Sequence, residues 1–462
     1  MLAAVLSLTT GCGARLSPEQ KLAAQGGRSG GASPTGGTAG TTGAGSSTAV
    51  GATGTSATGG GTSGSGTSAG GGQAGPAGPD ASGGQGASCA ATPGTAGPGV
   101  SDTEIKLGNV STISGPVPGL GQTAANGAKA YFNYINSQGG VCGRKLTLVP
   151  ADDRLDTAQN RAAYDALKDS VLGFVGGLSP VDNGGAAVLD GTNIPSTGIA
   201  IGDGAISSAN VFSPSPIPAS GDSNGTTGIW SWFKANRGVS KVAVIYPAQA
   251  DARARAMGYV RDIQAAGIPI DGPYEVAVTE TNYAGVVTKM KSDGADGFIT
   301  ALEVNGMSRL AQAVEQVGFS PKVGYYGAQA YGQQFIKLAG HAADTALIGA
   351  AYDIPENSAA NPAAGTFADW YARTNPGADP DYFAVTGWAA ADMMVQALQL
   401  AGGAPTRDAV IGALRTLNQF DAHGLIASCD PAGKVPSSSF AILGVQGGQW
   451  VRLYPATGFA SS

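Results

Sequence analysis

The most chemically suggestive residues in this sequence are Asp152 and Asp153, because paired carboxylates are used for general acid–base catalysis. Both lie at the end of a predicted strand, 145–149, with two residues between the strand and Asp152. Successive residues of a strand point to opposite faces, so these two carboxylates cannot share one substrate proton. We therefore expect both to be structural, either capping the next helix or holding the preceding loop.

Other patterns that carry chemistry are weaker still. The Gly-rich loop 115–121 is not followed by the Lys-Ser/Thr pair of a phosphate-binding loop. The chain has 2 histidines, His341 and His423, and they stand in no triad spacing and in no metal-ligand spacing with the cysteines. We expect no enzymatic activity, no metal and no cofactor.

The Asp pair closes a predicted βαβ unit. Its parts are strand 104–110, the loop 111–121, helix 124–137, a Gly-Gly helix stop and strand 145–149. Such a crossover implies parallel strands, and ligands bind beyond the carboxyl ends of parallel strands. We therefore expect the loop after the first strand, which contains Ser114, to form one wall of a ligand site.

The alternation of strands and helices continues to residue 326. We predict helices 158–169, 184–192, 254–266, 283–293 and 307–317, and strands 171–176, 194–200, 241–246, 274–278, 297–302 and 322–326. The Pro-rich segment 213–218 separates two series of elements, and prolines make such a segment stiff and extended. The sequence therefore predicts an α/β protein with two lobes and a cleft between them.

Residues 1–12 resemble a bacterial lipoprotein signal, in which the cysteine is acylated. An apolar stretch, Leu2–Leu8, precedes small residues and Cys12. No Lys or Arg precedes the apolar stretch, and Thr9 stands where Leu is usual. The alternative is a chance cysteine in a short apolar leader. We expect lipidation at Cys12 and a protein anchored to the outer face of the cell membrane.

Residues 13–98 are expected to form a disordered linker. From Ser29 to Ser88 almost every residue is Gly, Ser, Thr, Ala or Pro, and Asp80 is the single charged residue. Such a segment cannot bury enough apolar surface to offset the entropy of ordering. A flexible chain of about 60 residues has an r.m.s. span of roughly 40–45 Å.

Charge and hydropathy limit the partners. The net charge is −6 without any basic run, which argues against nucleic acid. No stretch after the leader is apolar for long enough to span a membrane, so we expect membrane contact through the lipid anchor only.

Cys89, Cys142 and Cys429 remain after the predicted signal. An exported protein favours disulfides, and three cysteines leave one over. Cys89 precedes the first predicted strand and Cys142 precedes the second, and the starts of adjacent parallel strands share one edge of a sheet. We prefer the pair Cys89–Cys142, with Cys142–Cys429 as the alternative.

Several motifs resemble those of branched-chain amino acid-type substrate-binding proteins of ABC importers, in order and spacing. They are Ile105–Gly108, Ser114–Pro116, Ile135–Lys145, Asp152-Asp153, Val175–Gly177, Asn193–Ser196 and Gln316–Phe319. The resemblance covers about residues 101–455. It implies the type I periplasmic-binding fold, with two Rossmann-like lobes, three crossovers that form a hinge, and a ligand in the cleft. The implied boundaries are 99–220 with 353–424 for lobe I, and 221–352 with 425–462 for lobe II.

The resemblance also implies binding residues. In similar proteins hydroxyls and backbone N–H groups after the third and fourth strands hold an amino acid carboxylate, and an acidic side chain of the other lobe holds the ammonium. By position these are Leu178-Ser179-Pro180-Val181, Ala200-Ile201-Gly202-Asp203 and Ala328-Gln329, with Leu120 and Phe383 at aromatic positions. Pro180 and Gly202 stand where the family has hydroxyls, and Ala328-Gln329 carries no charge.

Three acidic residues, Asp203, Asp251 and Glu303, fall at positions expected to border the cleft. They are either solvated charges at its rim or, together, a sign of a cationic or hydroxyl-rich ligand. The implied function is the capture of a small polar molecule, such as an amino acid or amide, for ABC permease subunits. The alternative is a sensory module of the same fold that signals to a partner protein.

The linker prediction can be tested by limited proteolysis of the full chain. Because residues 29–88 lack the apolar side chains of a core, protease should trim the chain to a stable fragment that begins between Ser88 and Asp102. Resistance of residues 29–88 equal to that of the remainder would contradict it.

Overall fold

The computed structural model describes residues 89–115, 119–217 and 222–461. The predicted signal segment with Cys12, and the linker up to residue 88, lie outside the described residues.

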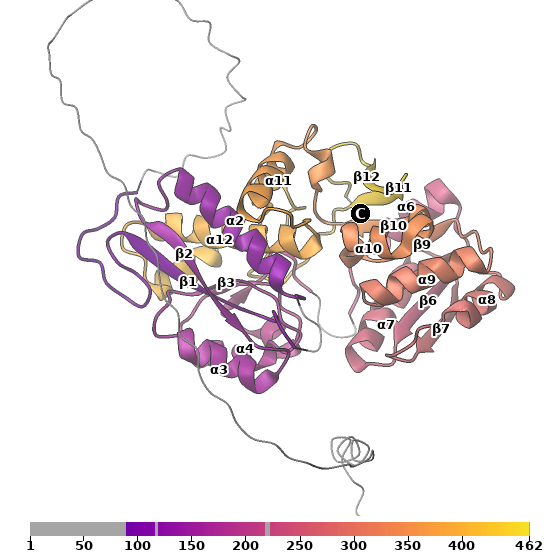
Figure 1. The fold of residues 1–462 in the computed structure, drawn as a ribbon, viewed down its shortest axis with the longest axis horizontal. Helices are drawn as coiled ribbons and strands as arrows, with labels where there is room; N and C mark the ends of the chain where they lie inside the picture. The colour runs from indigo at the N-terminus through magenta and orange to yellow at the C-terminus, as the bar shows by residue number, and fades with distance from the viewer. Residues whose placement is uncertain (1–88, 116–118, 218–221, 462) are drawn as a thin grey trace, which may run out of the picture. The chain divides into compact units, whose positions relative to one another are not determined.

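The first sheet has five strands in the order β2-β1-β3-β4-β5, and all of its pairings are parallel. Its elements are β1 Glu104–Ser111, α2 Gln122–Ser137, β2 Lys145–Asp152, α3 Thr157–Leu167, β3 Phe174–Gly177, α4 Asn183–Asp190, β4 Ser196–Gly198, α5 Asp203–Ser207 and β5 Val211–Phe212. In the predicted βαβ unit, the register runs from Glu104 opposite Lys145 to Ser111 opposite Asp152. Helices α3 and α4 lie on one side of this sheet and α2 on the other (Figure 1).

The second sheet has seven strands in the order β12-β11-β10-β9-β8-β6-β7. Its elements are α6 Thr227–Arg237, β6 Val242–Pro247, α7 Ala250–Ala265, β7 Ile270–Val276, α8 Ala284–Ser292, β8 Gly297–Thr300, α9 Val304–Gln316, β9 Val323–Tyr325, α10 Gln333–Ala339, β10 Ala346–Ala350, β11 Ala441–Gln446 and β12 Gln449–Tyr454. Strands β6 to β10 pair in parallel, whereas β11 pairs antiparallel with both β10 and β12. A hairpin at the end of the chain therefore completes an otherwise parallel sheet.

Between β10 and β11 the chain returns to the first sheet. It forms α11 Pro362–Thr374, α12 Tyr382–Ala401 and α13 Arg407–Leu414, and short 3₁₀ turns at Pro355–Asn357 and Ala422–Gly424. Two further 3₁₀ turns, Ala328–Ala330 and Gly340–Thr345, lie between β9 and β10. Helix α12 packs on α2, β3 and β4. Glycines permit the close crossing of α2 and α12, because a Cβ at Gly127 or at Gly387 would lie 2.0 Å from a backbone oxygen of the other helix.

The chain consequently passes between the two sheets three times: after β5, after β10 and before β11. The second and third passes are joined by a bridge between Tyr352 and Ile426. This arrangement is the predicted α/β fold of two Rossmann-like lobes with a three-strand hinge. We propose the lobe boundaries given by the sequence, 99–220 with 353–424 and 221–352 with 425–462.

The first described residues, 89–103, form a strap held on the first lobe by a disulfide and a buried arginine. Cys89 and Cys142 are bonded, with a Cα–Cα distance of 4.8 Å, and this is the pair preferred from the sequence. The guanidinium of Arg144 is fully buried and donates to the carbonyls of Ser101 and Gly403, both at 2.7 Å. Cys429 is buried and not part of a disulfide. Within the described ranges, no helix combines the length and apolar character needed to cross a bilayer.

The disulfide can be tested by peptide mapping of unreduced protein. We expect Cys89 and Cys142 in one linked peptide pair, and a Cys429 thiol that alkylates only after unfolding because it is buried. Replacing both bonded cysteines by serine should lower the free energy of unfolding by about 3–4 kcal/mol, since the bond closes a long loop. A linked Cys142–Cys429 peptide would contradict the pairing.

Candidate functional site

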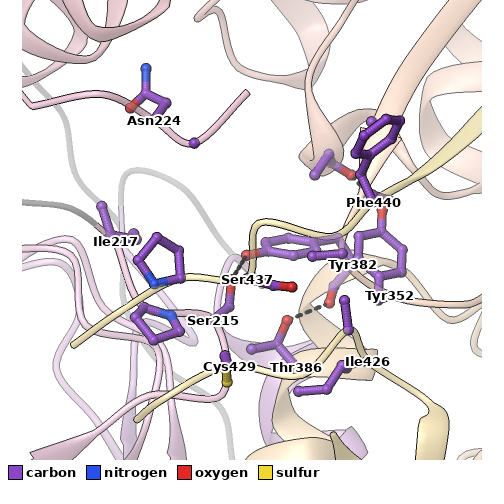
Figure 2. Close-up of a pocket in the computed structure, with 18 of the residues that line it drawn as sticks. Ser215, Ile217, Asn224, Tyr352, Tyr382, Thr386, Ile426, Cys429, Ser437 and Phe440 are labelled. Carbon is purple, nitrogen blue, oxygen red and sulfur yellow. Dashed lines mark hydrogen bonds between the residues drawn. The ribbon is translucent and has the colours of Figure 1, made fainter. Parts of the chain in front are cut away.

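A cavity of about 380 Å³ lies where the chain passes between the sheets. All three passes contribute to its wall (Figure 2). The loop after β4, the first turn of α12 and the region of α6 and α7 also contribute lining residues. Both lobes therefore line the cavity. The main lining groups are Ile199, Ile201, 214–217, 224–226, Arg255, Tyr259, 350–352, Tyr382, Phe383, Ile426 and 436–440.

Aromatic residues at the start of α12 form one wall. Asp381 is the N-cap of this helix and accepts from the Ala384 N–H at 2.9 Å, which fixes where Tyr382 and Phe383 begin the first turn. The Tyr382 hydroxyl lies 3.0 Å from Ser215 Oγ of the first pass, and its ring centroid lies 5.3 Å from that of Tyr352 of the second. Tyr382 therefore contacts two of the three passes.

The apolar side of the cavity comes from the first lobe. Ile201 and Phe383 pack against a small cluster that includes Leu178 and Ile199. Leu178 follows β3, and Ile199 and Ile201 follow β4, whereas Phe383 belongs to the first turn of α12. The carboxyl ends of β3 and β4 face this region.

Arg255 of α7 is the one charged residue among the described residues that line the cavity. It is half-buried. Its Nη1 lies 3.4 Å from Asn224 Oδ1, and Asn224 in turn donates from Nδ2 to the Arg255 carbonyl at 2.8 Å. Asn224 thus fixes the backbone that carries the guanidinium.

The loop after β4 is held by an internal carboxylate. Asp182 accepts from the Ile201 N–H at 2.7 Å and from the Gly202 N–H at 2.9 Å. Burial raises the pKa of Asp182 to about 6, against the lowering effect of these two bonds. Gly202 leaves no room for a side chain, because a Cβ there would lie 2.5 Å from Asn183 Nδ2.

The loop after β3 is also internally bonded. Ser179 is 2% exposed, and its Oγ accepts from the Val181 N–H at 3.2 Å and lies 3.4 Å from Thr112 Oγ1. The hydroxyl is therefore engaged within the first lobe.

A family model described as periplasmic binding protein matches residues 104–449. The chain belongs to this family. The match confirms the predicted family and fold, and an extracytoplasmic location follows from it.

Relatives of this periplasmic binding protein agree with that assignment. A Leu/Ile/Val-binding protein homolog of Brucella melitensis is 26% identical over 203 residues, which are 42% of this chain and 53% of that protein, so the chain spans about half the length of this relative. A fatty acid ABC transporter substrate-binding protein from Thermomonospora curvata superposes with a TM-score of 0.64 at 21% identity, over 79% of this chain and 94% of that one. LivJ of Streptococcus pneumoniae is a branched-chain amino acid transporter substrate-binding protein whose structure is in complex with isoleucine. It superposes with a TM-score of 0.63 at 18% identity, over 76% of this chain and 100% of that one. Both superpositions show a shared fold.

The structure brings four of the predicted binding residues of this periplasmic binding protein together. Ile201, Ala328, Gln329 and Phe383 line the cavity. Ser179, Ala200 and Gly202 belong to the two internally bonded loops, and the first two are buried.

Of the remaining predicted residues, those with described side chains do not line the cavity. Ser114 donates its hydroxyl to Asp152, Leu120 lies in the turn before α2, and Pro180 and Asp203 are exposed. Glu303 is the N-cap of α9 and accepts from the Asn305 N–H at 2.8 Å and the Gly306 N–H at 2.6 Å. Asp251 is in α7, and its side chain lies outside the described part of the chain.

The Asp pair has the structural role expected from the sequence. Asp152 accepts from the N–H groups of Ile113 and Ser114 at 3.0 and 3.1 Å. Partial burial acts to raise its pKa, but the bonds from Ser114, Arg154 and Ile113 outweigh it and lower the pKa to about 2. Asp153 is fully buried and accepts from Thr112 Oγ1 at 2.7 Å.

Residues 221–225 are Gly-Asp-Ser-Asn-Gly and fit the Gly-x-Ser-x-Gly nucleophile motif of serine hydrolases. Reading the sequence missed this motif. In the structure Ser223 donates to Asp262, a buried carboxylate that also accepts from the Thr226 N–H at 2.9 Å. This bond fits a structural role for Ser223, at the turn that begins α6.

Reading the sequence missed Arg255, Tyr352 and Tyr382. Arg255 sits in a helix beside the exposed Arg253, and nothing in the local pattern separates the two. Tyr352 follows β10 and was not assigned to an element. Tyr382 could have been found, because it adjoins Phe383, which the resemblance did single out.

Asp182 gives this site a testable pH dependence. Its pKa is about 6 in the folded protein against an ordinary 3.8, so between these values the folded state binds more protons than the unfolded state. The contribution of Asp182 to stability is therefore favourable at low pH and is lost as the pH rises from about 4 to about 6.

We expect the parent protein to lose about 2–3 kcal/mol relative to Asp182→Asn over this pH range, as measured by chemical denaturation. Other groups titrate in both proteins and cancel in the difference. The quantity compared is the free energy of unfolding of the parent protein minus that of Asp182→Asn. If it stays constant or rises with pH, the pKa of Asp182 in the folded protein is at its ordinary value or below.

Proposed function

We propose that this periplasmic binding protein captures a small organic molecule in the cavity between its lobes and delivers it to an ABC importer. The observation that carries the proposal is the 380 Å³ cavity, whose wall is drawn from both lobes and from all three passes of the chain. Cavities of this size are typical of small-molecule sites. The transport and binding roles in the names of the relatives support the same direction.

Binding is coupled to closure in this proposal. The three passes are the only covalent links between the sheets in the described chain and act as the hinge. A ligand that contacts the first lobe at Ile201 and the second at Arg255 favours the closed arrangement over the open one. The closed form is what the permease subunits would recognise.

The protein would be presented to the permease on a lipid anchor. Acylation at Cys12 would attach it to the outer face of the cell membrane, and residues 13–98 would give it reach. We propose a carrier and not an enzyme, with no cofactor. The sensory module is distinguished from the carrier by whether the liganded protein stimulates ATP hydrolysis by a reconstituted permease.

The cavity can be tested with a ligand-library thermal-shift screen of the full chain, followed by calorimetry with the compound found. Phe383→Ala should weaken binding about tenfold or more, because an apolar side chain that the ligand covers contributes about 1.5–3 kcal/mol. Leu338→Ala is the matched control, since Leu338 is 42% exposed and lies outside the lining residues. Equal affinities of the two variants would contradict a site at this cavity.

A further inference from the structure

The backbone donors after β4 are already in use. An amino acid carboxylate held by this loop needs free N–H groups, yet those of Ile201 and Gly202 both donate to Asp182. Gly202 also supplies no hydroxyl, and Asn183 fills the space that a side chain there would occupy. A ligand carboxylate would have to displace a bidentate internal carboxylate, so this loop is a poor anion site.

The loop after β3 gives no better anion site. The Ser179 hydroxyl is buried and engaged with Val181 and Thr112, and Pro180 has neither a hydroxyl nor an N–H to donate. The first lobe presents the apolar side chains of Ile199, Ile201 and Phe383 to the cavity. Its lining hydroxyls are already bonded, because Tyr382 pairs with Ser215 and Thr386 donates to the Tyr382 carbonyl.

The positive charge of the cavity comes from the second lobe. Arg255 lines the cavity and forms no ion pair with any side chain that the structure describes. No described lining residue is acidic. An arginine presents planar donors that match a carboxylate, and Asn224 beside it can add an amide donor.

We propose that the ligand is an organic monoanion, an apolar acyl or aryl chain whose carboxylate meets Arg255 and whose body lies on the apolar surface of the first lobe. This inference rests on the proposed function and names the ligand class of the same cavity. It differs from the cationic or hydroxyl-rich ligand considered from the sequence, which rested on Asp203, Asp251 and Glu303. Asp203 and Glu303 lie outside the lining residues, and the Asp251 side chain is outside the described part of the chain.

A zwitterionic amino acid fits this cavity less well than the corresponding acid. Its ammonium would be desolvated on closure without a described carboxylate to pair it. The amine with the same apolar body also has an ammonium that is desolvated without a partner, and it has no carboxylate to bind Arg255. The cavity therefore ranks the acid first, the amino acid second and the amine last.

Two sets of matched compounds test this ranking by calorimetry on the full chain. The first is 4-methylpentanoate, leucine and 3-methylbutylamine, and the second is 3-phenylpropanoate, phenylalanine and 2-phenylethylamine. We expect the acid of at least one set to bind about tenfold or more tighter than its amino acid, and both amines to give no heat of binding. An amino acid that binds as tightly as its acid, or tighter, would overturn the proposal.

Arg255→Gln should weaken binding of the acid about 10- to 100-fold, because a charge-assisted contact is lost. Arg253→Gln removes the same charge from an exposed position of the same helix and should leave affinity unchanged. Equal affinity of Arg255→Gln and Arg253→Gln for the acid would also overturn the proposal. If Arg255→Gln fails to fold, the comparison of acid with amino acid on the parent protein remains decisive.

The two proposals fail differently. If neither acid binds but a neutral or cationic compound from the library binds and is lost in Phe383→Ala, the monoanion inference is wrong and the capture function stands. If no compound of any charge shifts the melting temperature or gives heat, both proposals fall.

Discussion

The close crossing of α2 and α12 is the contact on which the site depends. Gly127 and Gly387 let the two backbones approach to a distance that any side chain would prevent. Thr197 of β4 adds a bond from its hydroxyl to the Ala390 carbonyl at 2.8 Å. Together these contacts hold the segment after β10 on the first lobe. Since β11 and β12 belong to the second sheet, the chain must cross between the lobes again, and the cavity forms at these crossings.

Buried carboxylates fix turns in both lobes, including the loop after β4 that borders the cavity. Asp153, Asp182 and Asp262 each accept hydrogen bonds from residues of the turns that follow strands or begin helices. Each of these aspartates is itself almost fully buried, so the bonds compensate a large desolvation cost. The loops are thereby fixed before any ligand arrives, which reduces the entropy lost on binding. The same bonds withdraw backbone donors from the ligand.

This use of carboxylates shapes the electrostatics of recognition. With the first-lobe donors engaged, the described surface of the cavity has an apolar side on that lobe. The other lobe adds uncharged polar residues such as Ser437–Ser439 and one charged group, the Arg255 guanidinium. A ligand with one charged end and one apolar end would contact both lobes only when they are closed. Hinge closure and charge recognition would then depend on the same contact at Arg255.

Much of the fold could be read from the sequence. The alternation of apolar strands and amphipathic helices between residues 104 and 326 is local information, and each predicted element has an observed counterpart within a few residues. Cys89 and Cys142 could also be paired, because both precede strands of one βαβ unit. Family motifs such as Ile135–Lys145 then indicated the fold of two lobes. The turn residues, caps and periodicity that define these elements act over a few positions along the chain.

Four residues of the cavity, Ile201, Ala328, Gln329 and Phe383, were expected from the sequence, but the tertiary structure decided the rest of its composition. Glu303 has the position of a ligand-binding acid in the sequence, but its carboxylate caps α9. Arg255 and Tyr352 have no distinguishing pattern, and they become cavity residues because α7 and the second pass of the chain are brought to one place. A polar group is available to a ligand only if it is not already engaged in a hydrogen bond within the protein. The partners in those bonds are often distant in the sequence, so the sequence alone does not identify the available groups.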